Sequence, residues 1–280
     1  MNEVEVKELF APVIKKFKKR RILTKRPHEL WAADLLDMRK YISDNRIVKR
    51  GRPPTKSIRG YRYILVVIDT FSKYLFLQPL EEKTGVTTTE AFEKILKSTK
   101  HRCNLLHVDA GTEFKNRTFE KLLDKYRIKK YQTYTKEKSA IAERVIRTIN
   151  QKLAKHFACT RKNEWVSFLP TLLKQYNEHD VHRSIGMPPI CVKTSNEAQV
   201  RRKLFPVFEI RSPKFKIGDR VRIAVDNKIF ENNYSPRWTK EIFIITQIHY
   251  TDPITYSIKD EYDEIVLGKF YTREMQKSLF

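Results

Sequence analysis

The stretch Asn104-Leu-Leu-His-Val-Asp109 has the pattern of a short buried strand that ends at a carboxylate. The next three residues, Ala110-Gly-Thr112, turn the chain. In α/β proteins, binding and catalytic groups collect at the carboxyl ends of strands along one edge of the sheet. Two further carboxylates, Asp34 and Glu143, occupy positions from which they can approach Asp109.

Residues 139–157 have the pattern of a helix. Apolar residues recur there at the spacing of one buried face, as Ile141, Val145, Ile149 and Leu153. Because each helical residue turns by roughly 100°, Glu143 lies about 200° around from Ile141 and points away from the core. Arg147 and Asn150 share this polar face. The sequence therefore predicts a carboxylate on the polar side of a packed helix.

Asp34 lies inside a strand candidate, residues 30–38, with apolar neighbours on both sides. Burying a carboxylate there is costly unless a cation or a hydrogen-bond donor compensates it. Hard carboxylate oxygens without thiolate or imidazole partners suit Mg²⁺ or Mn²⁺. With 33 acidic residues in the chain, a chance trio is easy to find, so the positions at strand and helix faces carry this prediction.

A chain of 280 residues holds one large or two modest domains and can bury a sizeable core. Its 57 Lys and Arg residues outnumber its 33 Asp and Glu residues, which gives a formal net charge of +24. This excess favours a polyanionic partner, most simply nucleic acid. An anionic membrane surface is the competing interpretation, but the sequence has no long apolar run for a spanning helix and no obvious lipidation signal.

The three cysteines, Cys103, Cys159 and Cys191, are scattered and form no C-x-x-C pair. This usage is typical of a reducing compartment and argues against a structural zinc site. No secretory signal opens the sequence. The basic cluster Lys15–Arg21 is a nuclear import signal, a DNA contact or merely solvated charge, and we expect the protein in the nucleus.

The alternation of strand-like and helix-like segments predicts a mixed five-stranded sheet flanked by helices. The expected strands are residues 30–38, 61–70, 74–80, 104–109 and 128–133. The expected helices are residues 87–98, 116–126, 139–157 and 164–179. Pro170 is expected to kink or split the last helix. Its six large apolar residues either belong to the core or form a face that pairs two copies of the chain.

The remaining segments divide the chain into four parts. Residues 1–27 are expected to form a basic leader without a core of its own, residues 28–193 the main domain, and residues 194–212 a basic connector. Within the main domain, Arg46–Arg59 has the composition of an exposed basic loop. Residues 213–280 predict a small barrel, with short strands at 216–223, 242–250, 255–259 and 264–271.

Three motifs together resemble the D,D-E core of retroviral-type integrases: Trp31-Ala-Ala-Asp34, His107-Val-Asp-Ala-Gly-Thr-Glu-Phe114 and Ala140-Ile-Ala-Glu-Arg144. The similarity continues through residues 61–73, 176–177 and 182–189. In the C-terminal part, residues 215–222 and 234–243 look most like the integrases of Maverick/Polinton DNA transposons. The resemblance covers roughly residues 28–278.

This resemblance implies an α/β fold, with a ribonuclease-H-like catalytic core followed by a small all-β SH3-like barrel. Carried over by position, Asp34, Asp109 and Glu143 match the catalytic, metal-binding triad of the family. The implied cofactors are two Mg²⁺ or Mn²⁺ ions about 3.5–4 Å apart. Asp34 would bridge both ions, and the other two carboxylates would each complete one site.

The implied activity is metal-dependent processing of the 3′ ends of an element's DNA, followed by transfer of those ends into target DNA. The implied partners are double-stranded DNA and further copies of the chain. The segment before the Glu143 helix and the basic strands of the barrel supply candidate DNA contacts, namely Tyr134, Lys136, Lys138, Arg144, Arg147, Arg220 and Arg222. Two other classes stay open: a nuclease of the same fold that cuts without joining, and a domesticated protein that only binds DNA or chromatin.

The sequence departs from the family pattern in two ways. The basic insertion Arg46–Arg59 is longer than expected between the first two strands, and no counterpart of the family's upstream His-His-Cys-Cys zinc module is present. Either the chain is a fragment, or its element works without that module. Asp69 is expected to be a turn and capping residue, and Glu113 a structural neighbour of the site.

Overall fold

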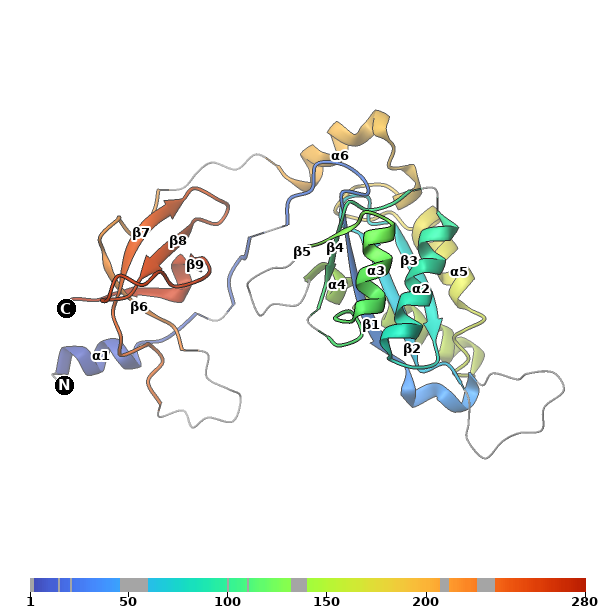
Figure 1. Cartoon of the computed structure of the whole chain (residues 1–280), viewed down its shortest axis with the longest axis horizontal. Helices are drawn as coiled ribbons and strands as arrows, with labels where there is room; N and C mark the ends of the chain where they lie inside the picture. The colour runs from blue at the N-terminus through green and yellow to red at the C-terminus, as the bar shows by residue number, and fades with distance from the viewer. Residues whose placement is uncertain are drawn as a thin grey trace. The chain divides into compact units, whose positions relative to one another are not determined.

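The computed structural model describes residues 3–14, 16–20, 22–45, 60–99, 101–109, 111–131, 140–206, 212–225 and 235–280. They form two compact units (Figure 1). The central unit is Leu23–Pro206, and the terminal unit combines Met1–Ile22 with Val207–Phe280. The sequence had set residues 1–27 apart as a leader, whereas the structure groups nearly all of them with the C-terminal sheet.

The central unit is built on a five-stranded sheet in the order β3-β2-β1-β4-β5. Its strands are β1 (Leu30–Asp37), β2 (Tyr63–Asp69), β3 (Leu75–Leu80), β4 (Leu105–Val108) and β5 (Lys129–Tyr131). β1 pairs antiparallel with β2 and parallel with β4, so the sheet is mixed. The sequence-based prediction of a mixed five-stranded sheet is confirmed.

Helices cover both faces of this sheet (Figure 1). α2 (Gly85–Ser98) and α3 (Arg117–Lys125) pack on one face, where Trp31 and Ala33 of β1 point. α4 (Ala140–Thr160) and α5 (Leu169–Lys174) pack on the other face, where Ala32 and Leu36 point. Because successive side chains of a strand alternate between faces, β1 serves both core layers.

The helix that was expected at residues 164–179 begins later, at Leu169. Pro170 lies in its first turn, where a missing N–H costs nothing, so it starts α5 rather than kinking a longer helix. A π-helical turn, Gln175–His179, completes the segment. Of the six apolar residues noted in the sequence, four are buried in the core cluster under α4 and α5, and two are partly buried against it; the four are Trp165, Leu169, Leu172 and Tyr176, and the two are Phe168 and Leu173.

The first half of the expected connector belongs to the central unit. α6 (Glu197–Leu204) buries Val200 and Leu204 in a small cluster with Phe71 and Ile185. Three basic residues in its last turn, Arg201-Arg-Lys203, remain on the outside. The chain therefore leaves the central unit only after this helix.

The terminal unit contains a second five-stranded sheet in the order β10-β6-β7-β8-β9, and every pair in it is antiparallel. Its strands are β6 (Arg220–Ile223), β7 (Phe243–His249), β8 (Thr255–Lys259), β9 (Phe270–Tyr271) and β10 (Met275–Lys277). The sequence missed β10 and extended the fourth expected strand over residues 264–271. Of that expected strand, only the last two residues, Phe270–Tyr271, form a strand. The preceding loop is held in turns, because the Asp260 side chain accepts hydrogen bonds from the backbone N–H groups of Tyr262 and Glu264.

The N-terminal helix α1 (Glu3–Phe10) packs on this second sheet. Leu9 is fully buried, and its carbonyl accepts hydrogen bonds from the backbone N–H groups of Arg237 (2.8 Å) and Trp238 (3.2 Å). The Trp238 indole Nε1 donates to the Ala11 carbonyl at 3.0 Å. The leader therefore has a core after all, which it shares with a segment more than two hundred residues away.

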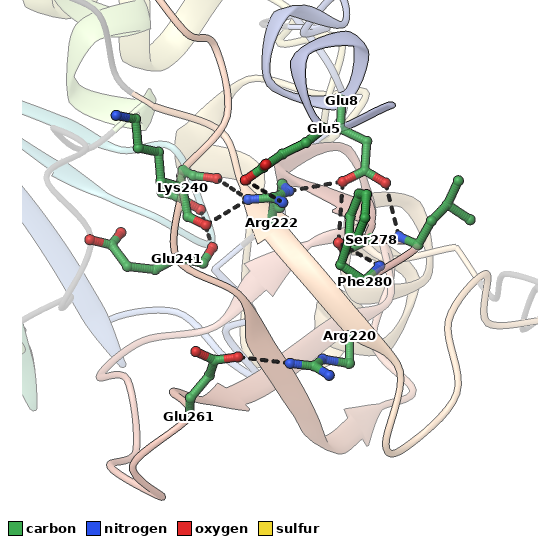
Figure 2. Close-up of polar contacts among 11 residues, drawn as sticks. Glu5, Glu8, Arg220, Arg222, Lys240, Glu241, Glu261, Ser278 and Phe280 are labelled. Atoms are coloured by element: carbon green, nitrogen blue, oxygen red, sulfur yellow. Dashed lines mark hydrogen bonds and ion pairs between the residues drawn. The ribbon is translucent and has the colours of Figure 1, made fainter. Parts of the chain in front are cut away.

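A buried ion pair fastens the two ends of the chain (Figure 2). Arg222 of β6 is 1% exposed, and its Nε donates to Glu8 Oε2 at 2.9 Å. The same carboxylate accepts from the Leu279 backbone N–H at 2.8 Å and from Ser278 Oγ at 3.2 Å. Burial alone would raise the pKa of Glu8, but these donors together lower it below the ordinary value. The sequence-based assignment of Arg222 as a DNA contact is corrected here, because its guanidinium is buried and already satisfied.

Replacing Arg222 by Ala is expected to destabilise the terminal unit by about 3–5 kcal/mol, because it leaves the Glu8 carboxylate buried without its cation. Arg220→Ala is the matched control two residues away on the same strand. Arg220 is half exposed, and its pair with Glu261 is worth about 0–1 kcal/mol. The measurement is urea denaturation of the full chain, monitored by a separate signal from each unit. It gives the free energy of unfolding of the terminal unit in each variant. Equal losses for the two variants would contradict the assigned weight of the buried pair.

Candidate active site

The two aspartates of the predicted triad lie in, or directly after, neighbouring parallel strands. The register pairs Ala33 of β1 with Val108, the last residue of β4, so Asp34 and Asp109 each follow one member of that pair. Adjacent strands are about 4.8 Å apart. This register brings the backbones of the two aspartates close to each other, and their role as metal ligands stays a prediction.

Both aspartates face the side of the sheet that α4 covers. Asp34 points to the same face as Ala32 and Leu36, because every second side chain of a strand shares a face. It also pairs with Val66 of β2. Ala32, Leu36 and Val66 all belong to the core cluster under α4. On β4, Leu106 and Val108 belong to the opposite cluster, which leaves His107 and Asp109 on the α4 side. Burial lowers the pKa of His107, and the charge of Asp109 opposes that shift, consistent with their sharing one face.

Glu143 lies in the first turn of α4. The helix buries Ala142, Val145, Ile149 and Leu153 against the sheet, and Glu143 is exposed on its outer side, as its position in the repeat predicted. Among the described residues, no three His, Cys, Asp or Glu side chains are arranged to hold a metal ion. The structure thus places Glu143 on the helix that covers the aspartates but does not close the three carboxylates into one cluster.

A lysine that the sequence analysis did not single out pairs with Glu113, and its pKa is affected by the charge of Asp34. Lys83, between β3 and α2, forms an ion pair of 2.9 Å with Glu113. The hydrogen bond to Glu113 raises the pKa of Lys83 against the effect of burial, and the charge of Asp34 adds to the rise. No signal of spacing could have found this pair, because its members are brought together only by the folding of the sheet and its connections.

Glu113 anchors the turn that follows Asp109. Its side chain is 7% exposed, and Gly111 passes so close that a Cβ there would lie 2.4 Å from Glu113 Oε2. Asn116, the N-cap of α3, donates through Nδ2 to the Glu113 carbonyl at 2.8 Å and accepts through Oδ1 from the Phe119 N–H. The glycine in the Asp109 motif is therefore required by the close approach of a fixed carboxylate.

Asp69 has the structural role that was predicted for it. It is fully buried at the end of β2 and accepts from the Phe71 N–H (3.0 Å), Ser72 Oγ (2.6 Å) and the His28 N–H (3.1 Å). These bonds hold the β2–β3 turn and tie it to the segment that precedes β1.

The remaining candidate DNA contacts divide into three groups. Arg144 and Arg147 are exposed on α4 beside Glu143. Arg220 is half exposed and pairs with Glu261 at 2.7 Å. Tyr134, Lys136 and Lys138 lie outside the described residues, as does the basic loop Arg46–Arg59. In the part of the chain that is described, no helix is long and apolar enough to cross a membrane.

Residues 24–136 match the integrase core domain family. The match contains the whole central sheet and both aspartates. It spans less than half of the 280 residues, so the similarity concerns this part of the central unit. The predicted mixed sheet with helices on both faces is confirmed.

Individual relatives extend the similarity. A transposon-derived protein of Caenorhabditis elegans is 29% identical over 216 residues, which cover 77% of this chain and 72% of that protein. The Pol polyprotein of Radiation murine leukemia virus is 30% identical over 135 residues, covering 46% of this chain and 22% of the polyprotein. A chain in a simian T-cell lymphotropic virus intasome, solved in complex with PP2A regulatory subunit B56 gamma, shares the fold over 95% of this chain, with a TM-score of 0.61 and 14% identity.

Gly111→Ala is expected to displace the Glu113 carboxylate, break its pair with Lys83 and destabilise the central unit by about 1–3 kcal/mol, the range for a buried polar group left unsatisfied. This loss of stability arises from one contact, that of the new Cβ with the Glu113 carboxylate. Gly111→Ala should therefore reduce stability much less in a protein that already carries Glu113→Ala. Thermal melting of the four proteins of this cycle gives the coupling. Additive losses would show that Gly111 is needed for another reason.

Proposed function

We propose that the protein is a DNA integrase that processes the 3′ ends of element DNA and joins them to target DNA. The proposal is supported by the parallel register that ends at Ala33 and Val108, directly before Asp34 and Asp109, in a region that matches the integrase core domain family. The motifs of the C-terminal part favour an element of the Maverick/Polinton type. The chain spans 22% of the retroviral polyprotein it matches, so the activity of that whole protein is carried here only as a proposal.

The donor set fits divalent metal ions. Asp34, Asp109 and Glu143 would hold Mg²⁺ or Mn²⁺, because they offer only hard oxygen ligands. Bound metal ions would supply activation of the attacking oxygen and stabilisation of the leaving oxygen. Glu143 begins a helix next to residues outside the described ranges, and we propose that it completes the set when DNA and metal are bound.

The chain's own residues would position the DNA. Arg144 and Arg147 share the exposed side of α4 with Glu143, so they are placed to hold backbone phosphates next to the carboxylates. Lys83 supplies a positive charge at Asp34 while it stays fixed by Glu113. Water attacks first and frees a 3′ hydroxyl, and that hydroxyl then attacks a phosphodiester of the target. Each attack forms one P–O bond and breaks another.

The terminal unit would add affinity for DNA. We infer that its sheet is an SH3-like barrel, since β6 to β9 form an antiparallel meander and a 3₁₀ turn, Thr272–Glu274, precedes β10, which pairs with β6. Two element ends must be joined to two target strands and one triad holds one end, so we propose a multimer assembled on DNA. We propose that it acts in the nucleus.

Asp34→Asn, Asp109→Asn and Glu143→Gln are each expected to abolish both reactions. The folded apo protein should be no less stable, because each carboxylate is replaced by an amide of nearly the same size and shape. Asp37→Asn is the control, since Asp37 lies on the same strand but is exposed and pairs with Arg39. The measurement is a joining assay with pre-processed oligonucleotide ends and Mn²⁺. Strand transfer by the Glu143→Gln protein would exclude the triad, and cleavage without joining by the wild type would indicate a nuclease.

DNA binding is expected to fall steeply with salt, because each neutralised phosphate contributes about −0.9 to the slope of log K against log salt on duplex DNA. Replacing both Arg144 and Arg147 by Ala should make that slope shallower by up to about 1.8. Lys97→Ala on α2 is the control, because Lys97 already pairs with Glu93 at 3.1 Å. Fluorescence anisotropy over a salt series gives the slopes, and an unchanged slope in the double variant would remove α4 from the DNA interface.

A further inference from the structure

The N-terminal segment continues along the second sheet after α1. The Phe17 ring meets Tyr271 of β9 edge-on at 5.5 Å between centroids. The Arg20 backbone N–H donates to Tyr271 Oη at 2.9 Å, and Lys18 Nζ lies 2.6 Å from Asp252 Oδ2. Residues 16–20 are therefore held against the sheet at three points, and the Arg20 side chain is exposed there.

This docking brings Arg20 of the N-terminal segment to the part of the sheet that carries Lys269 and His249. Lys269, just before β9, places its Nζ 3.1–3.2 Å from the two ring nitrogens of His249 on β7. His249 Nε2 also lies 2.8 Å from Ser257 Oγ on β8, which fixes the ring. Burial lowers the pKa of His249, and the charges of Lys269 and Arg20 lower it further. The Arg20 backbone is placed near this site by its hydrogen bond to Tyr271, two residues after Lys269.

The two outer cations of this cluster lack acidic partners. Across the described ranges, neither Arg20 nor Lys269 forms an ion pair, whereas Lys18, Lys259 and Lys277 of the same unit each pair with an aspartate. Two like charges held near one ring repel each other, and the fold gains nothing from that repulsion. A bound anion would relieve it.

We propose that Arg20 and Lys269 form a binding site for a phosphate of the DNA backbone. The His249 ring would hold the Lys269 side chain in position. Arginine offers a planar set of donors that matches two phosphate oxygens, and the exposed lysine adds a point charge. The N-terminal segment is then a functional part of the terminal unit, and the buried Glu8–Arg222 pair keeps it in place. This inference rests on the proposed function, because it takes duplex DNA as the ligand.

The test compares Arg20→Ala, Lys269→Ala and the double variant in the full chain, by anisotropy with duplex DNA over a salt series. Because both residues hold one phosphate, the double variant should make the salt slope shallower by about 0.9 in total, and not by about 1.8. Lys277→Ala is the matched control, since it removes the same formal charge from a lysine that already pairs with Asp219 at 2.8 Å. That control should leave the slope unchanged.

A charge-neutral variant separates the docked segment from simple loss of charge. Tyr271→Phe removes the acceptor of the Arg20 N–H and should weaken DNA binding in the wild type, but not in the Arg20→Ala background. Arg20→Lys should recover part of the affinity. Thermal melting checks that each variant is folded. We expect it to be, because the Arg20 and Lys269 side chains are exposed.

The outcomes distinguish this site from the proposed function. A wild-type protein that does not bind duplex DNA would overturn the proposed function. Wild-type binding with a steep slope that the double variant retains would overturn the site alone. A change in the double variant no larger than that of Lys277→Ala would mean that only net charge matters, and this result also overturns the site.

Discussion

The parallel pairing of β1 with β4 is the constraint on which the candidate site depends. It pairs Ala33 with Val108, and Asp34 and Asp109 directly follow these two residues. The period of a strand is two, so a slip of one residue in either strand would turn one carboxylate into the opposite core layer. The register is fixed because β1 is buried on both sides, by α2 and α3 on one face and by α4 and α5 on the other. The packing of the whole central unit therefore sets the distance between two charges.

Around this pair, the structure compensates buried charge locally. Glu113 would be a buried anion next to the Asp109 turn, and Lys83 neutralises it while its charge also reaches Asp34. In the terminal unit, Arg222 is compensated by Glu8 and by the carbonyls of Thr239 and Lys240, while Ser278 and Leu279 donate to Glu8. Such pairs add little net stability compared with apolar residues of the same size, but removing one partner is costly. Here the Lys83–Glu113 pair holds the turn beside the site. Glu8 of α1 binds both Arg222 of β6 and the backbone of Leu279, near the last residue of the chain.

The sequence predicted what depends on local pattern, and missed what depends on distant contacts. The apolar repeat of α4 and the strand patterns of β1 to β5 correctly gave the central sheet, its helices and the outward position of Glu143. The pair Lys83–Glu113 could not be found, because its members are thirty positions apart and meet only in the folded sheet. The docking of α1 was missed for the same reason, because Glu8 and Arg222 are 214 positions apart in the sequence. Pro170 was misread because a proline that begins a helix and one that kinks it have the same local sequence.

The terminal unit shows why a count of basic residues does not locate a DNA surface. Arg220 and Arg222 were chosen from the sequence because they lie on one strand of a basic barrel, yet Glu261 and Glu8 already pair with them. Lys18, Lys259 and Lys277 are likewise paired with aspartates. A cation that has an acidic partner must give up that contact before it can bind a phosphate, so its net gain from DNA is small. Arg20 and Lys269 have no such contact to give up among the described residues, and they lie together only because the N-terminal segment returns to the sheet. Where charge is abundant, the unpaired cations determine where a polyanion binds most favourably.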